Sequence, residues 1–140
     1  MGAIKKLTIE GFLSIRRLED FKLQHLNVLI GANGAGKSNF VSFFNLLRQL
    51  IDQNLEGALR TEGGADACLF LGPKVTERIA AKLCFGDNGY EFALTPTVDN
   101  RLIFAEEATV FRGRFGTVRR SLGSGHAESK LKEHKDDPGK

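Results

Sequence analysis

The segment "LNVLIGANGAGKS", residues 26–38, decides how the chain is expected to fold. It opens with a nearly all-apolar run, which is typical of a strand covered on both faces. It continues as G-x-x-x-x-G-K-S, with Gly31, Gly36, Lys37 and Ser38 at the fixed positions. In such a loop successive backbone N–H groups point at anionic oxygens, and the glycines permit close approach. The segment therefore predicts a phosphate-binding loop between a buried strand and a helix.

Downstream of the loop, apolar residues recur at helical spacing. They are Phe40, Phe43, Phe44, Leu47, Leu50 and Ile51. A helix starting at the loop directs its positive end at the phosphates, with Lys37 on the β and γ oxygens and the Ser38 hydroxyl on Mg²⁺. We expect ATP or ADP as the ligand. The predicted binding residues are Gly31, Ala32, Asn33, Gly34, Ala35, Gly36, Lys37, Ser38 and Asn39, and Ser38 is the predicted metal ligand.

The rest of the chain predicts mainly antiparallel strands. Alternating apolar residues favour strands at about 3–10 and 18–24. Residues 55–73 contain three glycine turn signals and predict a loop with a short apolar plug, Leu69 to Leu71. Residues 75–112 predict a meander of three antiparallel strands, with "GDNG" as a hairpin signal. From Gly113 onward apolar residues are sparse, which predicts a mobile tail.

Composition is that of an ordinary globular protein, with 140 residues, 41% hydrophobic and 26% charged. Residues 1–112 hold 13 basic and 13 acidic residues, whereas residues 113–140 hold 7 and 4, so the tail carries the whole net charge of +3. No apolar run is long enough to span a membrane. Two cysteines and three histidines lack metal-ligand spacing. We expect a cytoplasmic protein with reduced thiols, no zinc site and no membrane partner.

Nucleotide hydrolysis would need an acidic residue at the end of a second strand, to hold Mg²⁺ and polarise the attacking water. The segment "LIFAEE", residues 102–107, offers Glu106 and Glu107 as candidate catalytic acids. Against this role, the first acid is Glu rather than Asp, and the segment closes an antiparallel meander. The alternative interpretation is a partly exposed antiparallel strand without a catalytic role.

Residues 3–51 resemble the heads of ABC-type ATPases of the RecF/SMC group, including predicted AAA-family ATPases of bacterial repair and defence loci. The resemblance rests on the turn Phe12-Leu13-Ser14 and on "GANGAGKSN". It implies an α/β P-loop NTPase fold, and the meander resembles the antiparallel subdomain of such heads. It also implies ATP with Mg²⁺, a homodimer that sandwiches two nucleotides, and work on DNA or on a nuclease or toxin partner.

The sequence departs from this family pattern in several places. Several members have a basic residue that touches phosphates where this chain has Leu13, so Arg16 or Arg17 would have to take that part. No glutamine follows Gln53, and a signature motif and a switch histidine are absent. The resemblance therefore implies that residues 1–112 are a partial ATPase lobe, with the phosphate loop at 31–38 and the antiparallel subdomain at 75–112. Residues 113–140 would be a flexible basic tail or continue into the missing lobe of a protein two to three times longer.

Three functions stay open at this point. The first is an ATPase module, completed by motifs that this sequence lacks. The second is a non-catalytic module that binds nucleotide without hydrolysing it. The third is DNA binding through the tail, which is disfavoured because the tail has few aromatic residues and its acids dilute the positive field. The contact set of that third function is Arg114, Arg119, Arg120, Lys130 and Lys132.

Overall fold

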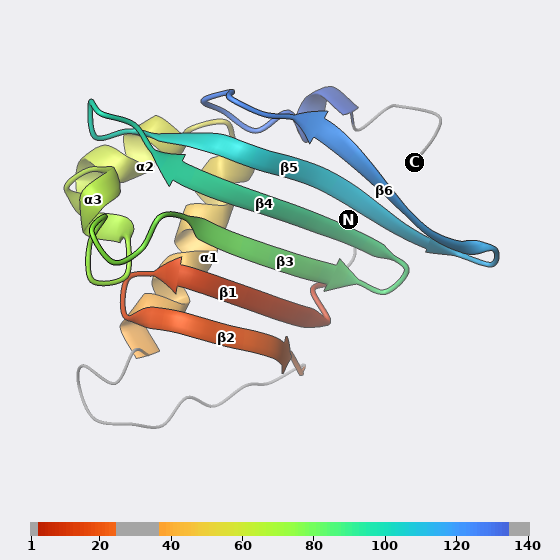
Figure 1. The fold of residues 1–140 in the computed structure, drawn as a ribbon. Coiled ribbons are helices and arrows are strands. Elements are labelled where there is room, and N and C mark those ends of the chain that lie inside the picture. Colours follow the sequence, from red (N-terminus) through yellow and green to blue (C-terminus); the bar gives the residue numbers. More distant parts are fainter. Residues whose placement is uncertain (1–2, 25–36, 135–140) are drawn as a thin grey trace.

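The computed structural model of the protein describes residues 3–24 and 37–134. In chain order the elements are β1 (Lys6–Phe12), β2 (Ile15–Lys22), α1 (Lys37–Ile51), α2 (Leu55–Glu62), α3 (Ala65–Cys68), β3 (Ile79–Phe85), β4 (Asn88–Pro96), β5 (Leu102–Gly113), β6 (Gly116–Gly123) and the 3-10 helix η1 (Lys132–His134). The strands form one sheet in the order β2-β1-β3-β4-β5-β6, and every neighbouring pair is antiparallel (Figure 1). The fold is therefore α/β.

α1 crosses one face of the sheet, behind the strands in Figure 1. The core lies between this helix and that face. Side chains alternate between the two faces of each strand. On β1, Leu7 and Ile9 are fully buried whereas Thr8 between them is half-buried. On β3 the same alternation buries Leu83 and exposes Lys82. The largest fully buried side chains include Tyr90, Phe43, Phe104, Leu7, Ile9, Leu50, Ile79, Leu83 and Leu94.

The strands predicted at about 3–10 and 18–24 and the helix predicted after the loop are confirmed, with shifted boundaries. β1 and β2 are joined by a two-residue turn, since Phe12 pairs with Ile15. The predicted helix is α1, and the predicted meander is β3, β4 and β5. The expected strand at 26–30 and the loop residues 31–36 lie outside the described residues.

The predicted loop at 55–73 is wrong in part, because α2 and α3 form there. Leu55 and Leu59, four residues apart on α2, are both buried against the core. Gly63, with φ of 95°, ends α2, and the next N–H group donates to the carbonyl of Leu59. The sequence signal was weak because a helix of eight residues has room for only one buried pair. None of the helices formed by the described residues is long and apolar enough to cross a membrane.

The predicted mobile tail is wrong for residues 116–123, which form β6. This strand pairs with β5 from Gly116 opposite Gly113 to Gly123 opposite Glu107. Leu122 is its only buried residue, so the apolar alternation that identifies a strand is missing. β6 forms because its backbone pairs with the long β5, although most of its side chains are exposed.

Gly11 allows a close approach at the end of β1, and this makes a testable prediction. Its φ is +75°, and a Cβ there would lie 2.5 Å from the carbonyl oxygen of Arg78 and 2.8 Å from a methyl group of Thr76. Gly86 has a similar φ of +82° but open space around it. We expect Gly86→Ala to lower the free energy of unfolding by about 1 kcal/mol, and Gly11→Ala by about 3 kcal/mol. Urea unfolding of both variants measures the difference, and equal losses would contradict the packing at Gly11.

Candidate functional site

Of the predicted phosphate loop, the structure describes only the last residues, which lie at the start of α1. Lys37 and Ser38 lie in the first helical turn, Lys37 half-buried and Ser38 exposed. This turn contains no acidic residue. The positive end of the helix is therefore not neutralised by a carboxylate of its own turn. The other predicted loop residues, Gly31 to Gly36, lie outside the described residues.

The first turns of α1 are fixed against the β1–β2 hairpin. The Asn39 amide donates to the hydroxyl of Ser14, in the turn between β1 and β2. The ring of Phe40 packs edge-on against Phe21, with centroids 5.5 Å apart, and Phe43 packs in the same way on Phe12 at 5.9 Å. These contacts bring the predicted Phe12-Leu13-Ser14 turn next to the start of α1. The sequence predicted both parts, and the structure brings them together.

Arg16 and Arg17, the two arginines expected to take the part of the basic residue that Leu13 replaces, are neighbours on β2, and both are exposed. Arg17 pairs across from Glu10 and forms ion pairs with Glu10 at 3.4 Å and Glu19 at 3.2 Å. Arg17 is therefore engaged on the surface of the hairpin, whereas Arg16 stays a prediction for that part.

The two candidate acids, Glu106 and Glu107, lie on opposite faces of β5. A bulge shifts the register here, because Ala93 pairs with Glu106 whereas Leu94 pairs with Phe104. The extra residue lets Phe104 and Glu107 both face the core. Glu106 is exposed and lies 4.0 Å from Arg78 and 3.8 Å from Arg119. The acids are therefore not a paired site: one is a surface residue and the other is buried.

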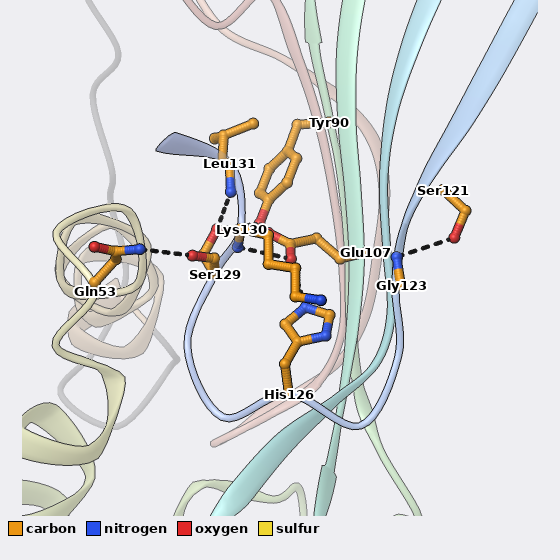
Figure 2. Close-up of polar contacts among 9 residues, drawn as sticks. All are labelled: Gln53, Tyr90, Glu107, Ser121, Gly123, His126, Ser129, Lys130 and Leu131. Atoms are coloured by element: carbon orange, nitrogen blue, oxygen red, sulfur yellow. Dashed lines mark hydrogen bonds and ion pairs between the residues drawn. The ribbon is translucent and has the colours of Figure 1, made fainter. Parts of the chain in front are cut away.

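Glu107 is the centre of a buried hydrogen-bond cluster (Figure 2). Its carboxylate accepts from the Tyr90 hydroxyl at 2.6 Å, from the Ser129 hydroxyl, and from the Lys130 N–H at 3.1 Å, and it lies 2.6 Å from Nε2 of His126. The His126 ring also stacks on Phe104, with centroids 4.8 Å apart. Burial and the Glu107 carboxylate raise the pKa of the Tyr90 hydroxyl far above its usual range. Tyr90 therefore stays a neutral donor.

The cluster holds residues 125–132, the strap, against the sheet and two helices. Gln53, just after α1, donates to the carbonyl of Ser129 at 3.1 Å (Figure 2). The carboxylate of Glu128 accepts from the first two N–H groups of α2, at 3.0 and 3.3 Å. Lys132 lies 3.9 Å from Asp52. The strap is thus connected to β4, β5, α1 and α2, although its sequence contains few apolar residues.

Glu107 and Ser38 lie near opposite ends of α1. The helix has 15 residues, and a rise of 1.5 Å per residue gives it a length of about 21 Å. Ser38 is in its first turn, whereas the strap that binds Glu107 contacts Gln53 beyond its last turn. Ligands of one Mg²⁺ ion must each lie about 2.1 Å from it. The structure therefore does not bring Glu107 to the predicted metal ligand.

The residues of the predicted DNA contact set lie in two separate places. Arg114, Arg119 and Arg120 belong to the β5–β6 hairpin, whereas Lys130 and Lys132 belong to the strap. Lys132 faces Asp52 of the α1 end, and the Lys130 N–H binds Glu107. The predicted set is therefore not one surface.

Sequence reasoning missed Tyr90, His126 and Ser129 as partners of Glu107. They lie 17, 19 and 22 residues from it along the chain. The sequence offered one signal, which is that Glu107 is the second of two acids after four apolar residues of a strand. Strict alternation would have exposed Glu107 rather than buried it. Only the bulge and the folded strap reveal why Glu107 is buried.

Cys68 lines a hollow of about 230 Å³ between α1 and α2, together with Phe12, Asn45, Leu46 and Leu59. Burial, and secondly the nearby Glu62 carboxylate, raise the pKa of its thiol to about 11. The second cysteine, Cys84, is half-buried on β3. Within residues 3–24 and 37–134, no group of three or more His, Cys, Asp or Glu side chains is arranged to hold a metal ion.

The chain matches a known protein family. Residues 26–125, more than half of the 140-residue chain, match the family described as "AAA domain, putative AbiEii toxin, Type IV TA system". The match begins at the apolar run before the predicted loop and includes every helix from α1 to α3 and strands β3 to β6. No curated protein and no solved structure matches the chain.

The buried position of Glu107 predicts a large effect of its replacement. Glu107→Gln puts an amide N–H₂ group among hydroxyl, ring and backbone donors and should lower the free energy of unfolding by about 3 kcal/mol. Glu106→Gln is the matched control on the exposed face and should change it by less than about 0.5 kcal/mol. Urea unfolding measures both. Hydrogen exchange should show lost protection in the strap of the Glu107 variant only, and equal behaviour of the two variants would contradict the cluster.

The raised pKa of Cys68 predicts low thiol reactivity. Because the thiolate is the reacting form, iodoacetamide at pH 8 should modify Cys84 in the folded protein and leave Cys68 unmodified. In urea both should react. Mass spectrometry of the peptides reads out each site, and modification of Cys68 at the rate of Cys84 in the folded protein would contradict its burial.

Proposed function

The chain belongs to the family of AAA domains described as a putative AbiEii toxin of a type IV TA system, and on this premise we propose that it binds ATP with Mg²⁺ through residues 31–39. The observation that carries the proposal is that α1 begins at Lys37, directly after the pattern G-x-x-x-x-G. A helix start with no acid in its first turn suits an anionic ligand.

Each residue of the proposed site has a separate task. The N–H groups of residues 31–36 surround the phosphates, and Gly31, Gly34 and Gly36 leave room for them. Lys37 supplies a positive charge to the β and γ oxygens, and the Ser38 hydroxyl is the protein ligand of Mg²⁺. Asn39 fixes the start of the helix through its hydrogen bond to Ser14. Bound Mg²⁺ would neutralise charge on the phosphates.

Binding and hydrolysis are separate proposals for this chain. Hydrolysis needs an acidic group close to the metal and the attacking water. Glu106 forms surface ion pairs, and Glu107 lies near the far end of α1. This favours a module that binds nucleotide but does not turn it over by itself.

Within the AAA domains, we infer that this chain is related to the ABC-type ATPase heads of the RecF/SMC group. In that arrangement two copies sandwich two nucleotides, and the partner supplies the groups that complete each site. We propose that ATP hydrolysis, if completed in this way, serves DNA repair or bacterial defence through DNA or a nuclease or toxin partner. The support is that the Phe12-Leu13-Ser14 turn lies against the first turns of α1, and both segments carry the resemblance.

Lys37→Ala tests nucleotide binding directly. Loss of a charged contact to phosphate should weaken binding of a fluorescent ATP analogue by about tenfold or more. Ser38→Ala should remove the Mg²⁺ dependence of binding, since it removes the metal ligand. Lys74→Ala, an exposed lysine in the loop before β3, is the control and should bind as the unchanged chain does. Equal affinity of Lys37→Ala and Lys74→Ala would overturn the proposal.

Turnover separates the two functional alternatives. Phosphate release from ATP by the 140-residue chain should stay at the background rate, in the presence of Mg²⁺ and at saturating protein. Hydrolysis above background that is lost in Lys37→Ala would contradict the non-catalytic alternative. An acidic group other than Glu106 and Glu107 would then have to lie close to Ser38.

A further inference from the structure

The β5–β6 hairpin extends past the rest of the sheet. The pairing of β4 with β5 ends at Asn88 opposite Phe111. Beyond this point the Arg112 N–H still donates to the carbonyl of Asp87, in the turn between β3 and β4, at 2.7 Å. The strand pairs of β5 there are with β6 alone, Arg112 with Thr117 and Gly113 with Gly116. Arg114 and Phe115 form the two-residue turn at its tip. Figure 1 shows the hairpin projecting beyond the neighbouring strands.

The hairpin is strongly basic. Residues 111–120 contain four arginines and no acidic residue. Arg119 lies on the sheet and forms ion pairs with Glu91 at 3.0 Å and Glu106 at 3.8 Å. In the part of the chain that the structure describes, Arg112 and Arg114 form no ion pair, and both are exposed. The uncompensated charge is therefore concentrated at the tip.

The same hairpin exposes apolar side chains. Phe115 at the tip is 99% exposed, and Phe111 and Val118 are 46% and 63% exposed. Phe111 and Val118 are cross-strand partners and share one face. Scattered exposed apolar residues are common on proteins. Here three of them share one projecting ribbon with two exposed arginines.

We propose that this hairpin is an arm that binds duplex DNA in a groove. Two antiparallel strands have the width that the major groove admits, and guanidinium groups bind phosphate oxygens in a two-pronged geometry. Phe115 at the tip acts as an apolar wedge against base edges in that groove. An acidic protein would complement the arginines, but it offers no general partner for a fully exposed ring. Anionic lipid would attract the same arginines, but a two-stranded ribbon matches a groove better than it matches a flat surface.

Two variants and a control test the arm. The double variant Arg112→Gln/Arg114→Gln removes the two exposed tip charges, and Phe115→Ser removes the wedge. The control Arg60→Gln/Lys74→Gln removes two exposed charges from α2 and the loop before β3, at the other end of the sheet. Binding of a short fluorescein-labelled duplex is measured by anisotropy over a series of KCl concentrations. No nucleotide is added, so the result is independent of the proposed ATP site.

The tip double variant should lower affinity about tenfold or more and reduce the slope of log K against log salt by about 2. Phe115→Ser should lower affinity about fivefold and leave that slope unchanged, because the ring contacts bases rather than phosphates. The control should match the unchanged chain. An equal loss in the control would overturn the proposal. Tighter binding of single-stranded DNA, of polyglutamate or of anionic lipid vesicles than of the duplex would overturn it as well.

Discussion

The rest of the structure depends on one buried carboxylate, that of Glu107. A charge removed from water must receive hydrogen bonds inside the protein, or it would be too costly to bury. The donors come from Tyr90 on β4 and from His126, Ser129 and Lys130 on the strap. Because the strap donors lie 19 to 23 residues beyond Glu107 in the chain, the hydrogen bonds to Glu107 fix the strap onto strands β4 and β5. Through Glu128 and Gln53 the same strap also caps α2 and contacts the end of α1.

The helix α1 connects two regions with different chemistry. Its first turns pack on the β1–β2 hairpin and carry Lys37 and Ser38. Its last turn lies near the strap, which is held by Glu107. The helix length keeps the buried carboxylate away from the proposed metal ligand, so the acid stabilises the fold rather than the nucleotide. A reading of Glu106 and Glu107 as one acidic motif fails for the same geometric reason.

Strand β5 has three functions along its length. At its start it closes the core through Phe104; in the middle its bulge turns Glu107 inward; at its end it extends into the hairpin with Arg112 and Arg114. Its length is what allows β6 to form, because the backbone of β6 has a partner even where its side chains face solvent. The exposed arginines and Phe115 are thereby held on a paired ribbon rather than on a free tail.

The sequence by itself determined the spacing of the predicted phosphate loop, the helix after it and the three-stranded meander, because these depend on local periodicity and turn residues. The glycines of the loop, residues 31–36, stay a prediction. The tertiary structure alone decided that β6 is a strand, that α2 forms, and that Glu106 is exposed while Glu107 is buried. Each of these depends on contacts that side-chain periodicity does not show: backbone pairing with β5 for β6, the core for Leu55 and Leu59, and the strap for Glu107. A one-residue bulge reverses which side chains face the core. The spacing of apolar residues along the chain does not reveal where the bulge lies.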